Sequence, residues 1–237
     1  MWLDLINIDD SWKGFLTKEV IDELTKIENS VGNDYTPESS KVLRFMGLDL
    51  NKMKVVILGQ DPYKPLGVAT GRSFEPANLY NWNDKFRQVS LKNIVRLIYK
   101  SLNNIEDYED IPSYKEITSK IVNGDFNIKE PKEWFNGLEE QGVLFLNTTL
   151  TCRIGVSNSH KSSWDNFSKK LITYISTENP ELYWFLWGKE AISNKEFIEN
   201  GKVYTSNHPM MCSEKYEDDF LKGECFKDTK NIIDWLG

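Results

Sequence analysis

The chain has 237 residues, of which 40% are hydrophobic and 27% charged, an ordinary composition for a globular protein with one sizeable core. Its net charge of −7 at pH 7 counts, taken alone, against a nucleic-acid partner. The three cysteines have no CxxC spacing, which argues against a zinc or iron–sulfur site. The chain has no signal-like opening segment and no apolar run long enough to cross a bilayer, so export and contact with a membrane are disfavoured.

Helical and strand-like segments alternate along the chain. In order, the sequence predicts helices at 18–29 and 38–46, a strand at 54–59, a helix at 90–102, a strand at 142–147, a helix at 163–176, a strand at 182–188, a helix at 189–199, a strand at 202–207 and a closing helix at 226–237. The strand segments are almost continuously apolar, as parallel strands covered on both faces are. We therefore predict an α/β fold built from right-handed βαβ units.

Acidic and basic side chains are separated along the chain. Residues 106–140 hold ten acidic and four basic side chains, whereas 52–74 and 153–170 each hold four basic and one acidic. We interpret 103–131 as an irregular acidic surface insertion within a single domain that spans 1–237. The two basic segments contain the candidate functional residues, so contact with phosphates is compatible with the negative net charge.

Polar residues follow the predicted strands, at the sheet edge where open α/β folds bind ligands. Asp61, Asn147, Lys189 and His208 should meet there. No GxxxxGK[ST], GxGxxG or GxSxG motif occurs, and neither histidine has a zinc-type spacing, so nucleotide-cofactor, serine-hydrolase and zinc sites are disfavoured.

Asp61, Asn147 and His208 suit one kind of reaction. Asp61, preset by Pro62 in a tight turn, can orient a water or stabilise a cation. The Asn147 amide can both donate to and accept from a base edge, and a neutral His208 can donate to an oxygen that gains charge. These roles fit hydrolysis of an N-glycosidic bond. Taken singly, each residue has an ordinary structural alternative: a turn carboxylate, a strand cap and a packed imidazole.

Four segments resemble, in order, the signature regions of the family 1 uracil-DNA glycosylases: "ILGQDPYKPLGVATGRSFEP", "QGVLFLNTTLT", "NSHKSSW" and "NHPMMCS". The resemblance implies a three-layer α/β/α sandwich around a four-stranded parallel sheet, and excision of uracil from DNA without cofactor or metal. It also implies a monomer, located in the cytoplasm or, if the source is eukaryotic or viral, in the nucleus. Its partners would be uracil-containing DNA, single- or double-stranded, and a protein inhibitor that mimics DNA.

The resemblance also implies residue roles. Asp61 would orient the attacking water and stabilise the sugar cation, and His208 would stabilise uracil O2. Four residues would bind uracil: Gln60 through its backbone, Tyr63 at C5 where it excludes the thymine methyl group, Phe74 by stacking and Asn147 at the Watson–Crick edge.

Departures from the family pattern concentrate in the parts that handle DNA. Lys64 replaces the histidine of GQDPYH, and in the loop that normally reads HPSPLS, Cys212 stands where leucine would wedge into DNA, next to the longer Met211. The expected DNA contacts are Lys64, Ser90, Lys189, Met211, Cys212 and Ser213. We hypothesise that single-stranded or locally opened DNA is the better substrate.

Two alternatives remain open from the sequence. The protein could be a superfamily glycosylase for another damaged base, which free uracil would not inhibit. It could also be a non-catalytic DNA-binding or scaffolding protein that retains the fold, with its acidic region as a partner surface.

Overall fold

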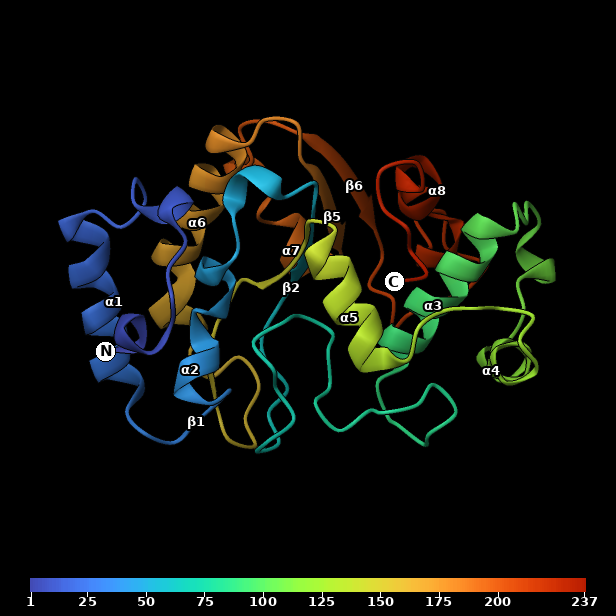
Figure 1. Cartoon of the computed structure of the whole chain (residues 1–237), viewed down its shortest axis with the longest axis horizontal. Coiled ribbons are helices and arrows are strands. Elements are labelled where there is room, and N and C mark those ends of the chain that lie inside the picture. The colour runs from blue at the N-terminus through green and yellow to red at the C-terminus, as the bar shows by residue number, and fades with distance from the viewer.

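The computed structural model describes all residues from 1 to 237. A parallel sheet lies at its centre and has the strand order β3-β2-β5-β6 (Figure 1). Its strands are β2 (Val55–Gly59), β3 (Val143–Asn147), β5 (Tyr183–Trp187) and β6 (Lys202–Ser206). Each strand of the sheet is parallel to its neighbours. The four predicted strands are thereby confirmed, with bounds close to those predicted.

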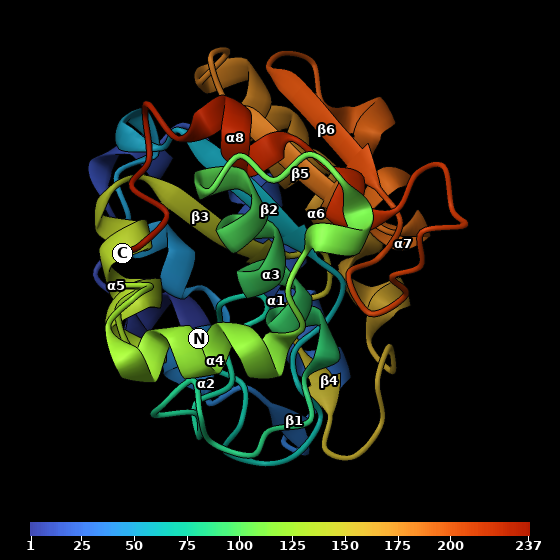
Figure 2. The same cartoon turned by 90° about the vertical axis from the view of Figure 1, so that its right-hand side faces the viewer.

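Helices cover both faces of this sheet (Figures 1 and 2). Val56 and Leu58 of β2 belong to one buried apolar cluster, and Val55 and Ile57 to another on the opposite face. The first cluster includes residues of α1 (Lys18–Val31), α2 (Ser39–Val42), α6 (Lys161–Glu178) and α7 (Lys189–Ile192); the second includes residues of α3 (Val89–Leu102), α4 (Tyr114–Asn123), α5 (Pro131–Glu140) and α8 (Cys225–Thr229). The predicted α/β/α sandwich is confirmed, and its two-sided burial explains the continuous apolarity of the strands.

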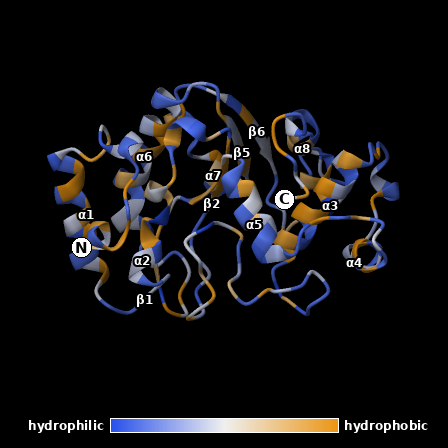
Figure 3. Ribbon diagram, in the orientation of Figure 1, coloured by the Kyte–Doolittle hydropathy of each residue, from blue (hydrophilic) through white to orange (hydrophobic).

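The helix α1 shows how the outer layers form. Thr17 caps its first turn by accepting from the N–H of Val20, and Gly32 ends it with a positive φ of 67°. The helix buries Val20, Leu24 and Ile27 at helical spacing, and Figure 3 shows hydrophobic and hydrophilic residues interspersed along it. Burial of each such side chain contributes about 1.5–3 kcal/mol to folding.

The interpretation of 103–131 as irregular was wrong for part of that segment. It contains α4, which begins with a capping box between Ser113 and Glu116 and ends at Gly124 with a φ of 80°. Ile117 is fully buried in the second apolar cluster. The α5 helix, which begins at Pro131 and buries Phe135, was not predicted.

Three predicted helices are shorter than expected. The segment 38–46 forms α2 and then a 3-10 turn (Arg44–Gly47), and 189–199 forms α7 and a 3-10 turn (Lys195–Phe197). The closing helix ends at Thr229. Beyond it the chain packs against α5: the Trp235 carbonyl accepts from Nε1 of Trp134, and the N–H of Asp234 donates to Gln141. These tertiary contacts replace helical hydrogen bonds.

A short antiparallel pair was not predicted. β1 (Tyr35–Thr36) pairs with β4 (Cys152–Arg153), and it fixes the start of the loop that leads into α6. No helix in the structure is both long and apolar enough to span a membrane.

Candidate active site

The ends of β2 and β3 meet at Gly59 and Asn147, which are partners in the parallel register. A Cβ atom on Gly59 would overlap the side chain of Asn147 and would approach the Ser73 Cβ to 2.6 Å. Glycine is therefore required for the Asn147 amide to lie at this point. Asn147 is only 5% exposed, and its side-chain amide makes no hydrogen bond within the protein. This arrangement leaves a preset donor and acceptor for a bound molecule.

The turn after β2 presents Asp61 at the same edge. The Gln60 carbonyl accepts from Oγ1 of Thr148 at 3.0 Å and from the N–H of Thr149 at 2.9 Å, so the residues after β3 hold this turn. Oδ2 of Asp61 accepts from the N–H of Asn158 at 2.8 Å. Burial raises the pKa of the half-buried Asp61 carboxyl, and the Asn158 N–H and the Lys64 charge act in the opposite direction.

Two aromatic residues form the wall of the site. The hydroxyl of Tyr63 donates to the Phe74 carbonyl at 3.1 Å, and burial raises the pKa of Tyr63, so it stays protonated. Phe74 has a φ of +64°, which is strained for a bulky side chain. Its ring centroid lies 5.6 Å from that of Trp187 and 6.4 Å from that of His208. Phe74 thus connects the Tyr63 turn to the end of β6.

His208 is held as a neutral imidazole with a defined donor. Its Nδ1 accepts from the N–H of Met210 at 3.2 Å, so the proton belongs on Nε2. Burial lowers the pKa of His208, which favours this neutral form. Gly188, at a φ of +86°, lets the histidine come close, because a Cβ atom there would lie 2.9 Å from that of His208. The Nε2–H group can therefore donate to an oxygen in the site.

The described geometry brings the predicted base-binding and catalytic residues together. A family model described as the uracil DNA glycosylase superfamily matches residues 47–230.

The chain belongs to the uracil-DNA glycosylase superfamily.

Curated relatives of this superfamily resemble nearly the whole chain. A uracil-DNA glycosylase from Clostridium beijerinckii is 31% identical over 95% of this chain and 92% of its own length. The one from Deinococcus radiodurans is 32% identical over 98% of this chain and 85% of its own length. The family resemblance predicted from the four motifs is confirmed.

Solved structures share the fold. The crystal structure of wild-type UNG from Nitratifractor salsuginis has a TM-score of 0.74 at 20% identity, covering 99% of this chain and 95% of that one. A mimivirus UNG variant in complex with UGI has a TM-score of 0.64 at 21% identity, covering 88% of this chain and 72% of that one. Both likenesses support the glycosylase fold of the chain.

The residues expected to contact DNA lie on several different elements of the structure. Lys64 is exposed three residues after Asp61, Lys189 is exposed at the start of α7, and Ser90 is half-buried in the first turn of α3. Ser213 is half-buried, and its N–H donates to Oδ2 of Asp219 at 2.6 Å. Phosphate contacts of these four residues remain predictions.

Met211 and Cys212, the two residues predicted to wedge into DNA, have different surroundings in the loop after β6. Asn93 donates to the Pro209 carbonyl at 2.7 Å and fixes the base of the loop. Cys212 packs against the second apolar cluster and its thiol donates to the same carbonyl at 3.4 Å, while burial raises its pKa to about 12. Met210 and Met211 are 60% and 57% exposed. Met211 therefore has the freer side chain of the two residues predicted to wedge.

Asn158 is a site residue that sequence reasoning missed. It lies in the "NSHKSSW" segment, which was noted only for its resemblance, and it contacts both Asp61 and Gln60. An asparagine has no distinctive spacing of its own. Only the fold shows that this loop closes over the Asp61 turn.

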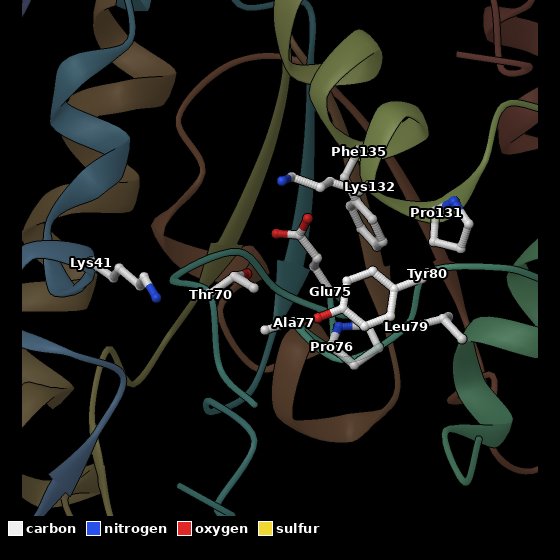
Figure 4. Close-up of a pocket in the computed structure, with 10 residues that line it drawn as sticks. All are labelled: Lys41, Thr70, Glu75, Pro76, Ala77, Leu79, Tyr80, Pro131, Lys132 and Phe135. Atoms are coloured by element: carbon white, nitrogen blue, oxygen red, sulfur yellow. The ribbon is translucent and has the colours of Figure 1, made fainter. Parts of the chain in front are cut away.

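A cavity of about 380 Å³ lies between α2, the 70–80 loop and α5 (Figure 4). Glu75, next to Phe74 in sequence, reaches into it, with Lys132 and Tyr80 at its edges. No predicted site residue lines this cavity. The candidate active site is therefore defined by the strand ends rather than by this cavity.

Proposed function

We propose that the protein excises uracil from DNA by hydrolysing its N-glycosidic bond, which leaves an abasic site. The convergence of Asp61, Asn147 and a neutral His208 at the carboxyl ends of the sheet carries this proposal. Relatives of nearly the same length that are named uracil-DNA glycosylase support it. The donor set consists of one carboxylate, one amide and one imidazole, which is sufficient for hydrolysis without a cofactor or metal.

Base recognition follows from the walls of the site. A flipped uracil would stack on Phe74 while the Asn147 amide donates to one base oxygen and accepts from N3–H. Tyr63 would stand against C5, where it leaves no room for a methyl group. Gln60 would contact the base through its backbone. Stacking and edge contacts would offset the few kcal/mol that unstacking costs.

Bond cleavage then uses the two catalytic residues. As the C1′–N1 bond breaks, its electron pair leaves with uracil and charge builds on O2, to which Nε2–H of His208 donates. The ionised Asp61 stabilises the positive sugar and orients a water. The water oxygen bonds to C1′ and its proton passes to the Asp61 carboxylate, which later releases it to solvent.

DNA would be held by exposed basic residues near the candidate site. Lys64 and Lys189 would meet phosphates as point charges, with Ser90 and Ser213 as hydrogen-bonding partners. Met211, assisted by Met210, would fill the space left by the base, while Cys212 supports the loop from below. Because no leucine stands at the wedging position, single-stranded or locally opened DNA remains the expected better substrate.

Further partners and the location of the protein belong to the same proposal. A monomer acts on DNA in the cytoplasm, or in the nucleus of a eukaryotic or virus-infected cell. A protein that mimics DNA would inhibit it, as suggested by the similar fold of the mimivirus enzyme solved with UGI. These points rest on analogy of fold and family.

Cleavage of a labelled oligonucleotide with one deoxyuridine tests the proposed function. Single-stranded DNA and duplexes with guanine or adenine opposite uracil are incubated with the protein and EDTA, then treated with alkali. We expect scission at uracil, none at thymine in a matched strand, and inhibition by free uracil. Scission at another damaged base without inhibition by uracil would favour a different superfamily specificity. DNA binding without scission by a folded protein would favour the scaffold alternative.

Replacing Met211 with alanine should reduce excision from duplex DNA more than from single-stranded DNA. Only a duplex needs its gap filled, and burial of such a side chain is worth about 1.5–3 kcal/mol, so a loss of about tenfold is expected on the duplex. Single-turnover rates on both substrates measure the effect, with Cys212→Ala as the matched comparison. A larger duplex-specific loss in the Cys212 variant would identify the cysteine as the wedge instead.

A further inference from the structure

Asn158, an exposed residue in the loop between β4 and α6, contacts the turn after β2 that contains Asp61. Its N–H donates to Oδ2 of Asp61 at 2.8 Å, and its Oδ1 accepts from Nε2 of Gln60 at 2.6 Å. The N–H of Gly155, in the same loop, donates to the Lys64 carbonyl at 2.8 Å and also connects the loop to the chain after Asp61. The Asp61 turn is thus held from the solvent side as well as from the end of β3.

The conformation of Asn158 is unusual and well braced. Its φ of +60° lies in the left-handed region, which asparagine enters more readily than other residues with a side chain. Ser159 Oγ accepts from the N–H of Arg153 at 2.6 Å and donates to the Val156 carbonyl at 2.9 Å. The loop therefore presents both the N–H and the side-chain oxygen of Asn158 to residues 60–61 before any substrate binds.

This contact has a direct consequence for Asp61. Within the protein only Oδ2 of the carboxylate accepts a hydrogen bond, so Oδ1 is left for a water. Burial raises the pKa of Asp61, whereas the Asn158 N–H lowers it because the bond favours the charged form. Without that bond the carboxylate would be freer to rotate and easier to protonate.

We propose that Asn158 is a positioning residue that fixes the Asp61 carboxylate, with one oxygen bound and the other free for the attacking water, and that keeps it ionised. It acts through Asp61 and touches neither uracil nor the sugar. The link to catalysis rests on the proposed function, whereas the effect on the carboxylate belongs to the protein without DNA.

Three variants test this inference. Asn158→Ala loses the side-chain oxygen and disfavours the left-handed backbone, so the N–H should leave Asp61. Asn158→Gly loses only the side chain, because glycine enters the left-handed region freely and keeps its N–H. Ser157→Ala, an exposed neighbour in the same loop, is the control. Thermal unfolding confirms that each variant is folded.

Single-turnover excision across pH and the carboxyl titration of Asp61, followed by NMR without DNA, are the measurements. We expect Asn158→Ala to lose about 10- to 100-fold in rate, since small displacements of a catalytic group have effects of this size. Its acid limb and its Asp61 pKa should both move to higher pH, while affinity for DNA with an uncleavable uracil nucleotide stays unchanged. Asn158→Gly should recover most of the rate and the wild-type titration.

An unchanged Asp61 titration in Asn158→Ala would overturn the inference whether or not the protein is active. Equal rate loss in the alanine and glycine variants would also overturn it, because the backbone N–H would then not be the group that matters. Absence of uracil excision by the wild-type protein, with the expected shift in titration, would overturn the proposed function and leave the positioning of Asp61 supported.

Discussion

Replacing Asp61 with asparagine should lower the rate of uracil release by about 10²- to 10⁴-fold, the range typical of a group that moves a proton in the transition state. Asparagine has the same shape, and its Oδ1 can still accept from the N–H of Asn158, so the turn should keep its geometry. It cannot balance a positive sugar or take a proton from water. The loss should therefore appear in the chemical step and not in DNA affinity.

Single-turnover rates and binding of uncleavable DNA measure the two effects separately. Asp10→Asn, which removes an exposed carboxylate paired only with Lys13, is the matched control and should behave as wild type. A rate for Asp61→Asn within a few-fold of wild type would remove Asp61 from the mechanism.

The same carboxylate should set the acid limb of the pH profile. Because burial raises the pKa of Asp61, activity that requires its ionised form is lost as pH falls through a value above that of an ordinary carboxyl. Burial lowers the pKa of His208, so the imidazole stays neutral to a lower pH than an ordinary histidine does. In Asp61→Asn the residual rate should lack this limb.

The sheet and its ends could be predicted because the local signal and the global fold agree. Within the segment 54–59, β2 is apolar at every position since both faces of the strand are buried, and its 5 residues suit a strand but are too few for an ordinary helix. Residues that follow such strands must lie at one edge. Asp61, Asn147 and His208 were therefore placed together by topology, and the family motifs then suggested their roles.

Other elements depend on contacts that the local sequence does not encode. The acidic composition of 103–131 hid α4, although Ser113, Glu116 and Gly124 carried a start and stop signal. The chain end after Thr229 has helical periodicity but forms turns, which are bonded to Trp134 and Gln141. Tertiary packing overrode propensity in this segment.

The direction of the side chains in the loop after β6 could not be predicted from the sequence either. Alignment of the motif places Cys212 at the wedging position, but the bonds from Asn93 to Pro209 and from Ser213 to Asp219 turn the loop so that the thiol faces the core. Asp219 is 1% exposed and lies in a different segment, so no reading of "HPMMCS" alone reveals the anchor. The exposure of Met211 follows from this anchoring.

Replacing His208 with leucine should lower the rate by about 10²- to 10³-fold, the usual effect of removing one donor to a developing oxyanion. The Nε2–H group is fixed by the bond from the Met210 N–H to Nδ1, so it needs no reorganisation when charge appears on O2. His208→Gln keeps an N–H donor on a more flexible side chain and should recover part of the loss.

Changing the leaving group distinguishes a role of His208 in charge stabilisation from a merely structural role. 5-Fluorouracil forms a more stable anion than uracil, and fluorine is small enough to stand beside Tyr63, so its release should depend less on a donor at O2. The loss caused by His208→Leu, measured as a ratio of single-turnover rates, should therefore shrink with the fluorinated base. If His208 only held the loop and Phe74 in place, both bases would lose activity equally, since a displaced ring or loop would harm their binding alike.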